Sequence, residues 1–82
     1  MITVRYFAGA RAAAGLESEP VAIPEGATVD DVLALIGARH GAALQRVLTA
    51  SSLLLDEVAV RSRTHPIPPN STLDILPPFA GG

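Results

Sequence analysis

The chain has 82 residues and a formal net charge of −2, and almost half of it is hydrophobic. This length provides one domain with a small core. Cysteine is absent from the sequence, which excludes disulfides, thiolate metal sites and thiol catalysis, and two histidines give a metal site little to draw on. The six basic residues are all arginines scattered along the chain, so no nucleic-acid-binding patch is expected.

The N-terminal residues predict a strand rather than a targeting segment. Residues 2–8 are rich in β-branched and aromatic types and alternate, with Ile2, Val4 and Tyr6 on one face and Phe7 on the other. They lack a basic region followed by a long apolar stretch, and no run approaches the roughly 18 apolar residues of a membrane span. We therefore expect no membrane association and a cytoplasmic location.

The middle of the chain predicts a second strand and one main helix. Residues 10–14 are alanine-rich, enough for one or two helical turns that end at Gly15, and residues 17–23 follow as a strand. The main helix would begin after Thr28, a suitable N-cap, and end at Gly41. Its apolar residues recur at helical spacing and predict one buried stripe. This stripe would contain Val29, Val32, Leu33 and Ile36.

The second half predicts a short helical piece and two strands. Residues 42–50 would form the helix, and residues 53–60 a strand that bends near Asp56 and Glu57. Adjacent residues on a strand point to opposite faces, so these two acids are interpreted as a solvated bend rather than a catalytic pair. Residues 73–76 alternate as a last strand, which the two prolines that follow end.

Together these elements predict an α+β domain of the β-grasp, ubiquitin-like type, a mixed sheet packed against one main helix. The first and last strands are the most apolar and are expected to be neighbours at the sheet centre. Residues 66–71 are too rich in proline for a central strand and should form a loop or an edge. The domain would span residues 1–78, and residues 79–82 would be a flexible C-terminal tail.

The tail carries the clearest functional signal, although an idle frayed end is the ordinary reading of a terminus. Gly81 and Gly82 have no side chains, so they could enter a narrow channel in another protein. Pro77-Pro78 would set the direction in which the tail leaves the domain. Activation of the Gly82 carboxylate by ATP, followed by attack of a sulfur donor, would give a thiocarboxylate, so a chain without cysteine could carry sulfur.

The opening Ile2–Ala8, followed by Arg11 and Gly15, and the ending Pro77–Gly82 resemble the MoaD/ThiS family of ubiquitin-like sulfur carriers. Within it they are most similar to the small subunits of molybdopterin synthase, over essentially the whole chain. The resemblance implies adenylation of Gly82 by an E1-like, MoeB-like adenylyltransferase that uses ATP and Mg²⁺, with no cofactor bound permanently by the chain.

The resemblance also implies a large catalytic, MoaE-like subunit, with which the chain would form a heterotetramer. There the thiocarboxylate sulfur would pass to precursor Z (cyclic pyranopterin monophosphate) in molybdenum cofactor biosynthesis. The chain would be a sulfur-donor subunit without catalysis of its own. One departure is Pro68–Ser71, which stands where family members often have a Gly-Asp turn and leaves open a divergent paralogue.

The candidate site residues follow from the tail and the resemblance. Gly82 would be the reacting residue, and Gly81 and Ala80 would give it access; no metal ligand is expected. Partner contacts are expected from Phe79, Pro78, Pro77, Phe7 and Arg11.

Some of these residues, and the two histidines, have structural readings as well. Phe7 is also a core candidate, the favoured assignment, and Arg11 could be an ordinary solvated arginine. His40, at the end of the main helix, is expected to complement the helix dipole rather than bind a ligand. His65 is expected to lie in a loop.

Three alternatives remain open. A carrier for thiazole or cysteine biosynthesis would use the same chemistry, although thiazole carriers are typically shorter and lack the two prolines. A ubiquitin-like modifier would join Gly82 to lysines of other proteins; with no lysine of its own, this chain could not build lysine-linked chains on itself. A plain β-grasp binding module would keep its function after deletion of Gly81 and Gly82, whereas a carrier or modifier would lose it.

Overall fold

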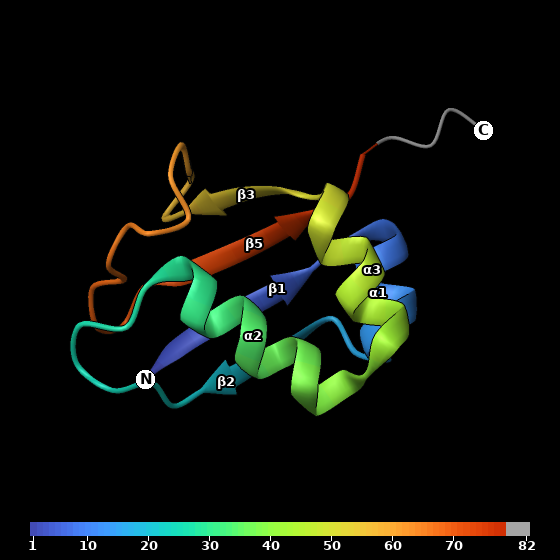
Figure 1. Cartoon of the computed structure of the whole chain (residues 1–82), viewed down its shortest axis with the longest axis horizontal. Helices are drawn as coiled ribbons and strands as arrows, with labels where there is room; N and C mark the ends of the chain where they lie inside the picture. Colours follow the sequence, from blue (N-terminus) through green and yellow to red (C-terminus); the bar gives the residue numbers. More distant parts are fainter. Residues whose placement is uncertain (79–82) are drawn as a thin grey trace.

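A computed structural model describes residues 1–78 as one five-stranded mixed sheet with three helices (Figure 1). The alternating burial of β1 indicates that the helices cover one face of the sheet and leave the other open. The elements are, in chain order, β1 (Ile2–Tyr6), α1 (Ala8–Ala14), β2 (Ser18–Val21), α2 (Val29–His40), α3 (Ala42–Ala50), β3 (Ser52–Leu55), β4 (Val58–Ala59) and β5 (Thr72–Leu76).

The first and last strands lie side by side in the sheet, whose strand order is β2-β1-β5-β3-β4. β1 pairs with β5 in parallel, with Val4 opposite Leu73, and with β2 in antiparallel orientation. β5 pairs with β3 in antiparallel orientation on its other side. The predicted β-grasp fold and the central position of β1 and β5 are therefore confirmed.

The core lies between the sheet and the helices. Ile2, Val4 and Tyr6 of β1 and Leu73 and Ile75 of β5 point into it and are at most 2% exposed. The helices add the predicted stripe of α2, all four of whose residues are buried, and Leu44 and Leu48 of α3. Burial of one apolar face per element is what the alternating strand pattern and the helical spacing predict.

The N-terminus of α2 is fixed by a capping box and by the loop that precedes β5. The Thr28 hydroxyl accepts a hydrogen bond from the Asp31 backbone N–H (3.2 Å), and the Asp31 carboxylate accepts one from the Thr28 N–H (2.9 Å). The backbone N–H groups of Val29 and Asp30 donate to carbonyls of His65 and Arg63. His65 thus lies in the loop, as expected, and its backbone helps to hold α2.

Helix α1 is longer than the sequence predicts, because it begins at Ala8 and includes Gly9. Ala8 has a positive φ of 48°, which turns the chain from β1 directly into the helix. The predicted end at Gly15 is confirmed: this residue has the left-handed conformation (φ 83°) and its N–H donates to the Arg11 carbonyl.

The single bent strand predicted over residues 53–60 is wrong. The chain instead forms the hairpin β3–β4, in which Leu55 pairs with Val58 across a turn made of Asp56 and Glu57. Both turn residues have positive φ (47° and 70°), as two-residue hairpin turns require. Aspartate is common at the first position of such turns, but Glu57 stands where glycine usually follows, so the turn has no strong local signal. Both acids are exposed, in agreement with their interpretation as solvated.

The second strand is shorter than predicted. β2 covers Ser18–Val21 and lies at the sheet edge, where Pro20 is tolerated because one side of the strand needs no ladder partner. The proline-rich residues 66–71 form a loop, as expected, from which Ile67 is buried in the core. Among the described residues, no helix has the length and apolar character that a membrane crossing needs.

Candidate docking surface at the end of the central strands

The chain leaves the sheet at the end of β5. Leu76 and Pro77 are half-buried and Pro78 is exposed, and this end of β5 lies beside α1 and α3, opposite the N-terminus (Figure 1). Because β5 is held on both sides by strands, the exit point is fixed by the fold. The sequence-predicted residues Phe79, Ala80, Gly81 and Gly82, and with them the predicted flexibility of the tail, lie outside the described residues.

Phe7 lies at the same end of the sheet. Its backbone N–H donates to the Ile75 carbonyl (3.2 Å), which continues the β1–β5 ladder by one step. The side chain is 38% exposed, so the favoured core assignment for Phe7 is wrong. The physical reason is the strand alternation, which turns Tyr6 into the core and Phe7 away from it. An exposed aromatic ring therefore stands next to the exit of the tail.

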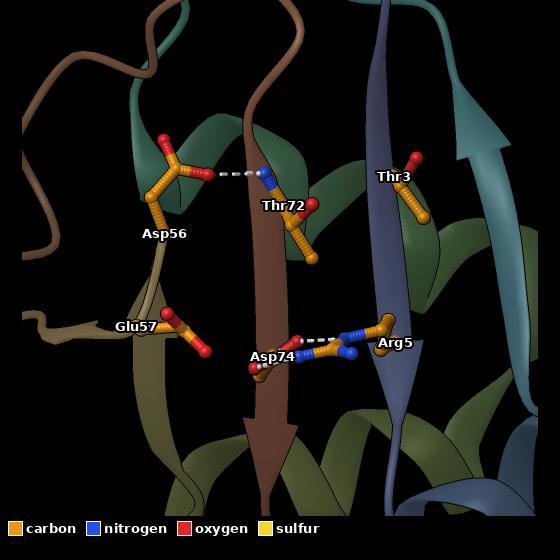
Figure 2. A pocket seen from close by; sticks show the side chains of 6 residues that line it. All are labelled: Thr3, Arg5, Asp56, Glu57, Thr72 and Asp74. Atoms are coloured by element: carbon orange, nitrogen blue, oxygen red, sulfur yellow. Dashed lines mark hydrogen bonds and ion pairs between the residues drawn. The ribbon is translucent and has the colours of Figure 1, made fainter.

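An ion pair braces this ring on the open face of the sheet. Arg5 and Asp74 lie opposite each other in β1 and β5, and Nε and Nη2 of Arg5 donate to the two Asp74 carboxylate oxygens at 2.6 and 2.7 Å (Figure 2). The Asp74 side chain is only 5% exposed and that of Arg5 46%. The hydrogen bonds and the charge of Asp74 raise the pKa of Arg5. The guanidinium carbon of Arg5 lies 5.6 Å from the centroid of the Phe7 ring.

A shallow hollow of about 360 Å³ adjoins the ion pair on this open face. The Asp56 carboxylate accepts a hydrogen bond from the Thr72 N–H (2.8 Å) and fixes the hairpin turn against β5 (Figure 2). Three carboxylates and one guanidinium line the hollow, a formal charge of −2 that equals that of the whole chain. The lining residues are Thr3, Arg5, Asp56, Glu57, Thr72 and Asp74.

Arg11 lies on α1, one helical turn beyond Phe7. It forms an ion pair with Glu17 (2.9 Å) in which both side chains are largely exposed. Such a surface pair contributes little to stability. Arg11 is therefore accessible to solvent, and its backbone N–H donates to the Phe7 carbonyl (3.4 Å), so it lies at the same end of the domain as Phe7.

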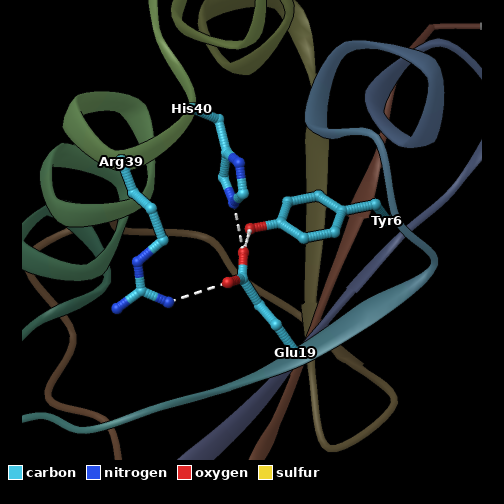
Figure 3. Close-up of polar contacts among 4 residues, drawn as sticks. All are labelled: Tyr6, Glu19, Arg39 and His40. Carbon is cyan, nitrogen blue, oxygen red and sulfur yellow. Dashed lines mark hydrogen bonds and ion pairs between the residues drawn. The ribbon is translucent and has the colours of Figure 1, made fainter.

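A second polar cluster is buried on the helix side of the sheet. Glu19 of β2 is 9% exposed and accepts hydrogen bonds from the Tyr6 hydroxyl (2.5 Å) and an Arg39 guanidinium nitrogen (2.7 Å) (Figure 3). Nε2 of His40 lies 2.5 Å from the same carboxylate, and the His40 ring meets the Tyr6 ring edge to face. The interpretation of His40 as a mere dipole complement is thus incomplete, because it also ties the end of α2 to β2.

The charges in this cluster hold one another in place. Burial of the Glu19 carboxyl favours its neutral form, but the hydrogen bonds from Tyr6, His40 and Arg39 outweigh this and lower its pKa. Burial and the hydrogen bond to Glu19 raise the pKa of Tyr6 far above its ordinary value. Both oxygens of the Glu19 carboxylate are bound by side chains within the domain. We therefore assign this cluster a role in stability rather than in catalysis.

The features found in residues 1–78 are those of a surface that would present the end of the chain to a partner protein. No group of three histidine, cysteine or acidic side chains among residues 1–78 could hold a metal ion. Every buried side-chain polar atom in this part of the chain has a hydrogen-bond partner. What the open face offers is an exposed ring, an ion pair and a fixed exit for the chain that follows Pro78.

The sequence analysis missed Glu19, Arg5, Asp74 and Arg39, and the first three leave a signal in the strand pattern. Glu19 is two residues from Val21 on the inward face of β2, which is an unusual place for an acid without a partner. Arg5 and Asp74 both fall on the outward face of strands predicted to be neighbours. Alternation combined with strand adjacency could have paired them, whereas the pairing of Glu19 with His40 depends on the packing of α2.

Comparison with known proteins identifies one family. The model of the ThiS family matches residues 4–82. No curated protein sequence matches the chain. Among solved structures, SAMP1 from Haloferax volcanii is similar with a TM-score of 0.86 and 25% identity, covering 99% of this chain and 98% of that one.

Two further similar structures are associated with molybdopterin by their descriptions. A putative molybdopterin converting factor subunit 1 from Pyrococcus furiosus has a TM-score of 0.79 and 23% identity, covering 95% of this chain and 97% of its own. In a complex of subunits 1 and 2 of molybdopterin-converting factor from Helicobacter pylori, the matching chain has a TM-score of 0.70 and 17% identity, covering 99% and 97%. At these identities the two structures support the fold.

Proposed function

Because the chain belongs to the ThiS family of ubiquitin-like sulfur carriers, we propose that it is the sulfur-donor small subunit of a molybdopterin synthase. The observation that carries the proposal is the point at which the chain leaves the sheet. The central strand β5 leads through Pro77-Pro78 directly into Phe79-Ala80-Gly81-Gly82, and the family match extends to Gly82. The domain would thus present Gly81 and Gly82, which have no side chains, from a fixed point of its surface next to the exposed Phe7 ring.

The proposed chemistry takes place on Gly82, which must carry the terminal carboxylate. A carboxylate oxygen attacks the α-phosphorus of ATP on the activating enzyme, and Mg²⁺-bound pyrophosphate leaves. A donor sulfur at the oxidation level of sulfide then attacks the acyl carbon, the bond to AMP breaks, and a thiocarboxylate, AMP and a proton are released. The thiocarboxylate later gives its sulfur to precursor Z, and hydrolysis of the acyl group restores the carboxylate.

Three partners follow from this chemistry. An E1-like, MoeB-like adenylyltransferase supplies ATP and Mg²⁺, a sulfur donor supplies the sulfur, and a MoaE-like large subunit provides the catalytic site, in a heterotetramer. The complex from Helicobacter pylori, which contains subunits 1 and 2 of molybdopterin-converting factor, supports the last of these. The chain would act in the cytoplasm and would not be an enzyme by itself.

A second function, a ubiquitin-like protein modifier, is favoured by the similarity to SAMP1 from Haloferax volcanii and from Methanosarcina acetivorans, which are described as small archaeal modifier proteins. The acyl-adenylate of Gly82 would then be attacked by a lysine amine of another protein rather than by sulfur. Both functions need the same activation and the same tail, so the fold alone does not separate them.

The experiment is intact-mass analysis of the protein incubated with ATP, Mg²⁺, the host's activating enzyme and a sulfur source. Replacement of one terminal oxygen by sulfur has the same nominal mass change as oxidation. The change must therefore be located on Gly82 by fragmentation and lost on alkylation or alkaline hydrolysis. Deletion of Gly81 and Gly82 is the matched control, because it removes the reacting group and leaves residues 1–78 intact.

A sulfur on Gly82, followed by its loss when the large subunit and precursor Z are added, supports the proposed function. A sulfur that is retained with these partners points to a carrier for another pathway. Conjugates in which Gly82 is joined to lysines of other proteins favour the modifier function. An unmodified Gly82 under conditions that thiolate a known carrier overturns the carrier function.

A further inference from the structure

The ion pair of Arg5 and Asp74 lies on the open face of the sheet, in contact with an aromatic ring that the fold leaves exposed. We propose that this pair is a positioning device, which holds the Phe7 ring in advance as the apolar contact for the activating enzyme that receives the tail. The inference rests on the proposed function. It adds that the Arg5–Asp74 ion pair orders the Phe7 side chain before a partner binds.

The geometry of the pair makes it rigid. Two parallel hydrogen bonds of 2.6 and 2.7 Å join the planar guanidinium of Arg5 to both oxygens of Asp74. Such a fork fixes orientation as well as distance, which a single contact of a lysine would not do. The Asp74 side chain is almost fully buried in the sheet, so the anchor of the fork does not move with solvent-exposed groups.

The ring is held by the guanidinium. The 5.6 Å between the Arg5 guanidinium carbon and the Phe7 ring centroid is a cation–π distance. The ring has the Arg5 guanidinium beside it, and Phe7 as a residue is still 38% exposed, so surface remains for a partner. A side chain that is ordered before binding does not lose its freedom on binding, a saving that corresponds to about two- to tenfold in affinity.

The position of the ring indicates which partner it meets. β1 and β5 run in parallel and end together, and Phe7 donates to Ile75, one residue before the end of β5. A protein that takes the segment after Pro78 into a channel must therefore approach the Phe7 ring. Aromatic side chains of this kind are frequent energetic anchors in interfaces.

The first test measures the order of the ring in the free protein, by ¹³C relaxation of the Phe7 ring. The variant is Arg5→Met combined with Asp74→Asn, because removal of both charges leaves no unpaired buried carboxylate. We expect a more mobile Phe7 ring and an otherwise unchanged spectrum, with Arg5→Lys in between. Equal ring order in the variant and the unmodified protein would overturn the inference.

The second test measures the KM and kcat of the activating enzyme for the carrier. The double substitution should raise KM by about two- to tenfold and leave kcat unchanged, and Arg46→Met, which removes an exposed arginine on α3, should change neither. In a Phe7→Ala background the double substitution should have no further effect on KM. Additive effects would mean that Arg5 and Asp74 act independently of Phe7, and would refute positioning.

The two tests separate this inference from the function on which it rests. If the unmodified protein is not activated at all, the proposed function fails, and the relaxation measurement still decides whether the ion pair orders the ring. If activation occurs and KM is insensitive to the double substitution, the proposed function stands and the positioning role is wrong.

Discussion

At the scale of single residues, Glu19 makes stability depend on pH. Its pKa lies below the ordinary value of 4.5, because the hydrogen bonds from Tyr6, His40 and Arg39 outweigh the effect of burial. A carboxyl whose pKa is lower in the folded than in the unfolded state stabilises the fold above the unfolded pKa. This contribution is lost as the pH falls through the folded pKa.

We therefore expect Glu19→Gln to lower the free energy of unfolding by about 2 kcal/mol at pH 7, as for other hydrogen bonds to charged groups. The difference between the variant and the unmodified protein should begin to shrink as the pH falls below the unfolded-state pKa of about 4.3. It should disappear once the pH has fallen through the lower pKa of the folded state, where Glu19 is protonated in both states. Denaturant titrations at pH 7, 5 and 3 measure this. A difference that is the same at all three values would contradict the assignment.

Tyr6 provides a second residue-scale prediction, because it is the only tyrosine of the chain. Burial and the hydrogen bond to Glu19 raise its pKa well above the ordinary value of 10.0. The free energy of unfolding should therefore fall as the pH rises above that value, because Tyr6 releases its proton in the unfolded state and keeps it in the folded state. We expect no tyrosinate absorbance near pH 10 while the protein is folded. The absorbance should appear together with alkaline unfolding, followed by circular dichroism; ionisation in the folded state would show that the cluster is open to solvent.

At the scale of elements, the β3–β4 hairpin has an unfavourable local conformation at its turn. Glu57 has a φ of 70°, which costs a residue with a side chain about 1 kcal/mol relative to glycine. We expect Glu57→Gly to raise the free energy of unfolding by about 0.5–1 kcal/mol, measured by thermal and chemical denaturation. Glu57→Ala is the matched control, since it removes the same side chain without the freedom of glycine, and equal stability of the two variants would speak against backbone strain.

Helix α2 and the β3–β4 hairpin differ in how well local sequence patterns predict them. α2 could be predicted with both its ends, because its capping residues, apolar spacing and terminal glycine agree within one segment. The turn of Asp56 and Glu57 could not, because its conformation is imposed by the pairing of Leu54 with Ala59 and of β3 with β5, and not by its own residue types.

The candidate docking surface consists of Phe7, the Arg5–Asp74 ion pair and the exit of the chain at Pro77 and Pro78. Some of its parts could be predicted from the sequence and others could not. The motif at the chain end and the exposed position of Phe7 follow from local order and alternation. The brace of Arg5 and Asp74 requires two strands separated by most of the chain to lie in a particular register. The buried assignment of Phe7 is wrong because the alternation that turns Tyr6 into the core turns Phe7 to the other face.

At the scale of the whole molecule, stability depends on the central strands. Ile75 of β5 is fully buried between the sheet and the helices. Its truncation to alanine should cost about 2–5 kcal/mol. The total for a domain of this size is only roughly 5–10 kcal/mol, so Ile75→Ala should remove a large share of the free energy of unfolding.

Chemical denaturation checks this prediction, and Val58→Ala is the control. Val58 is 69% exposed on β4, and its truncation should change the free energy of unfolding by no more than about 0.5 kcal/mol. If the two variants are equally stable, the core does not depend on β5 in the way that the burial indicates.

The parallel pairing of β1 and β5 also has a mechanical consequence. The chain enters β1 at one end of the sheet and leaves β5 at the other (Figure 1). A pull on the segment after Pro78 is therefore directed along β5, and the hydrogen bonds to β1 and β3 bear the load in shear, all at once, rather than one after another. A partner could draw the end of the chain into a channel and release it again many times without peeling the last strand out of the domain.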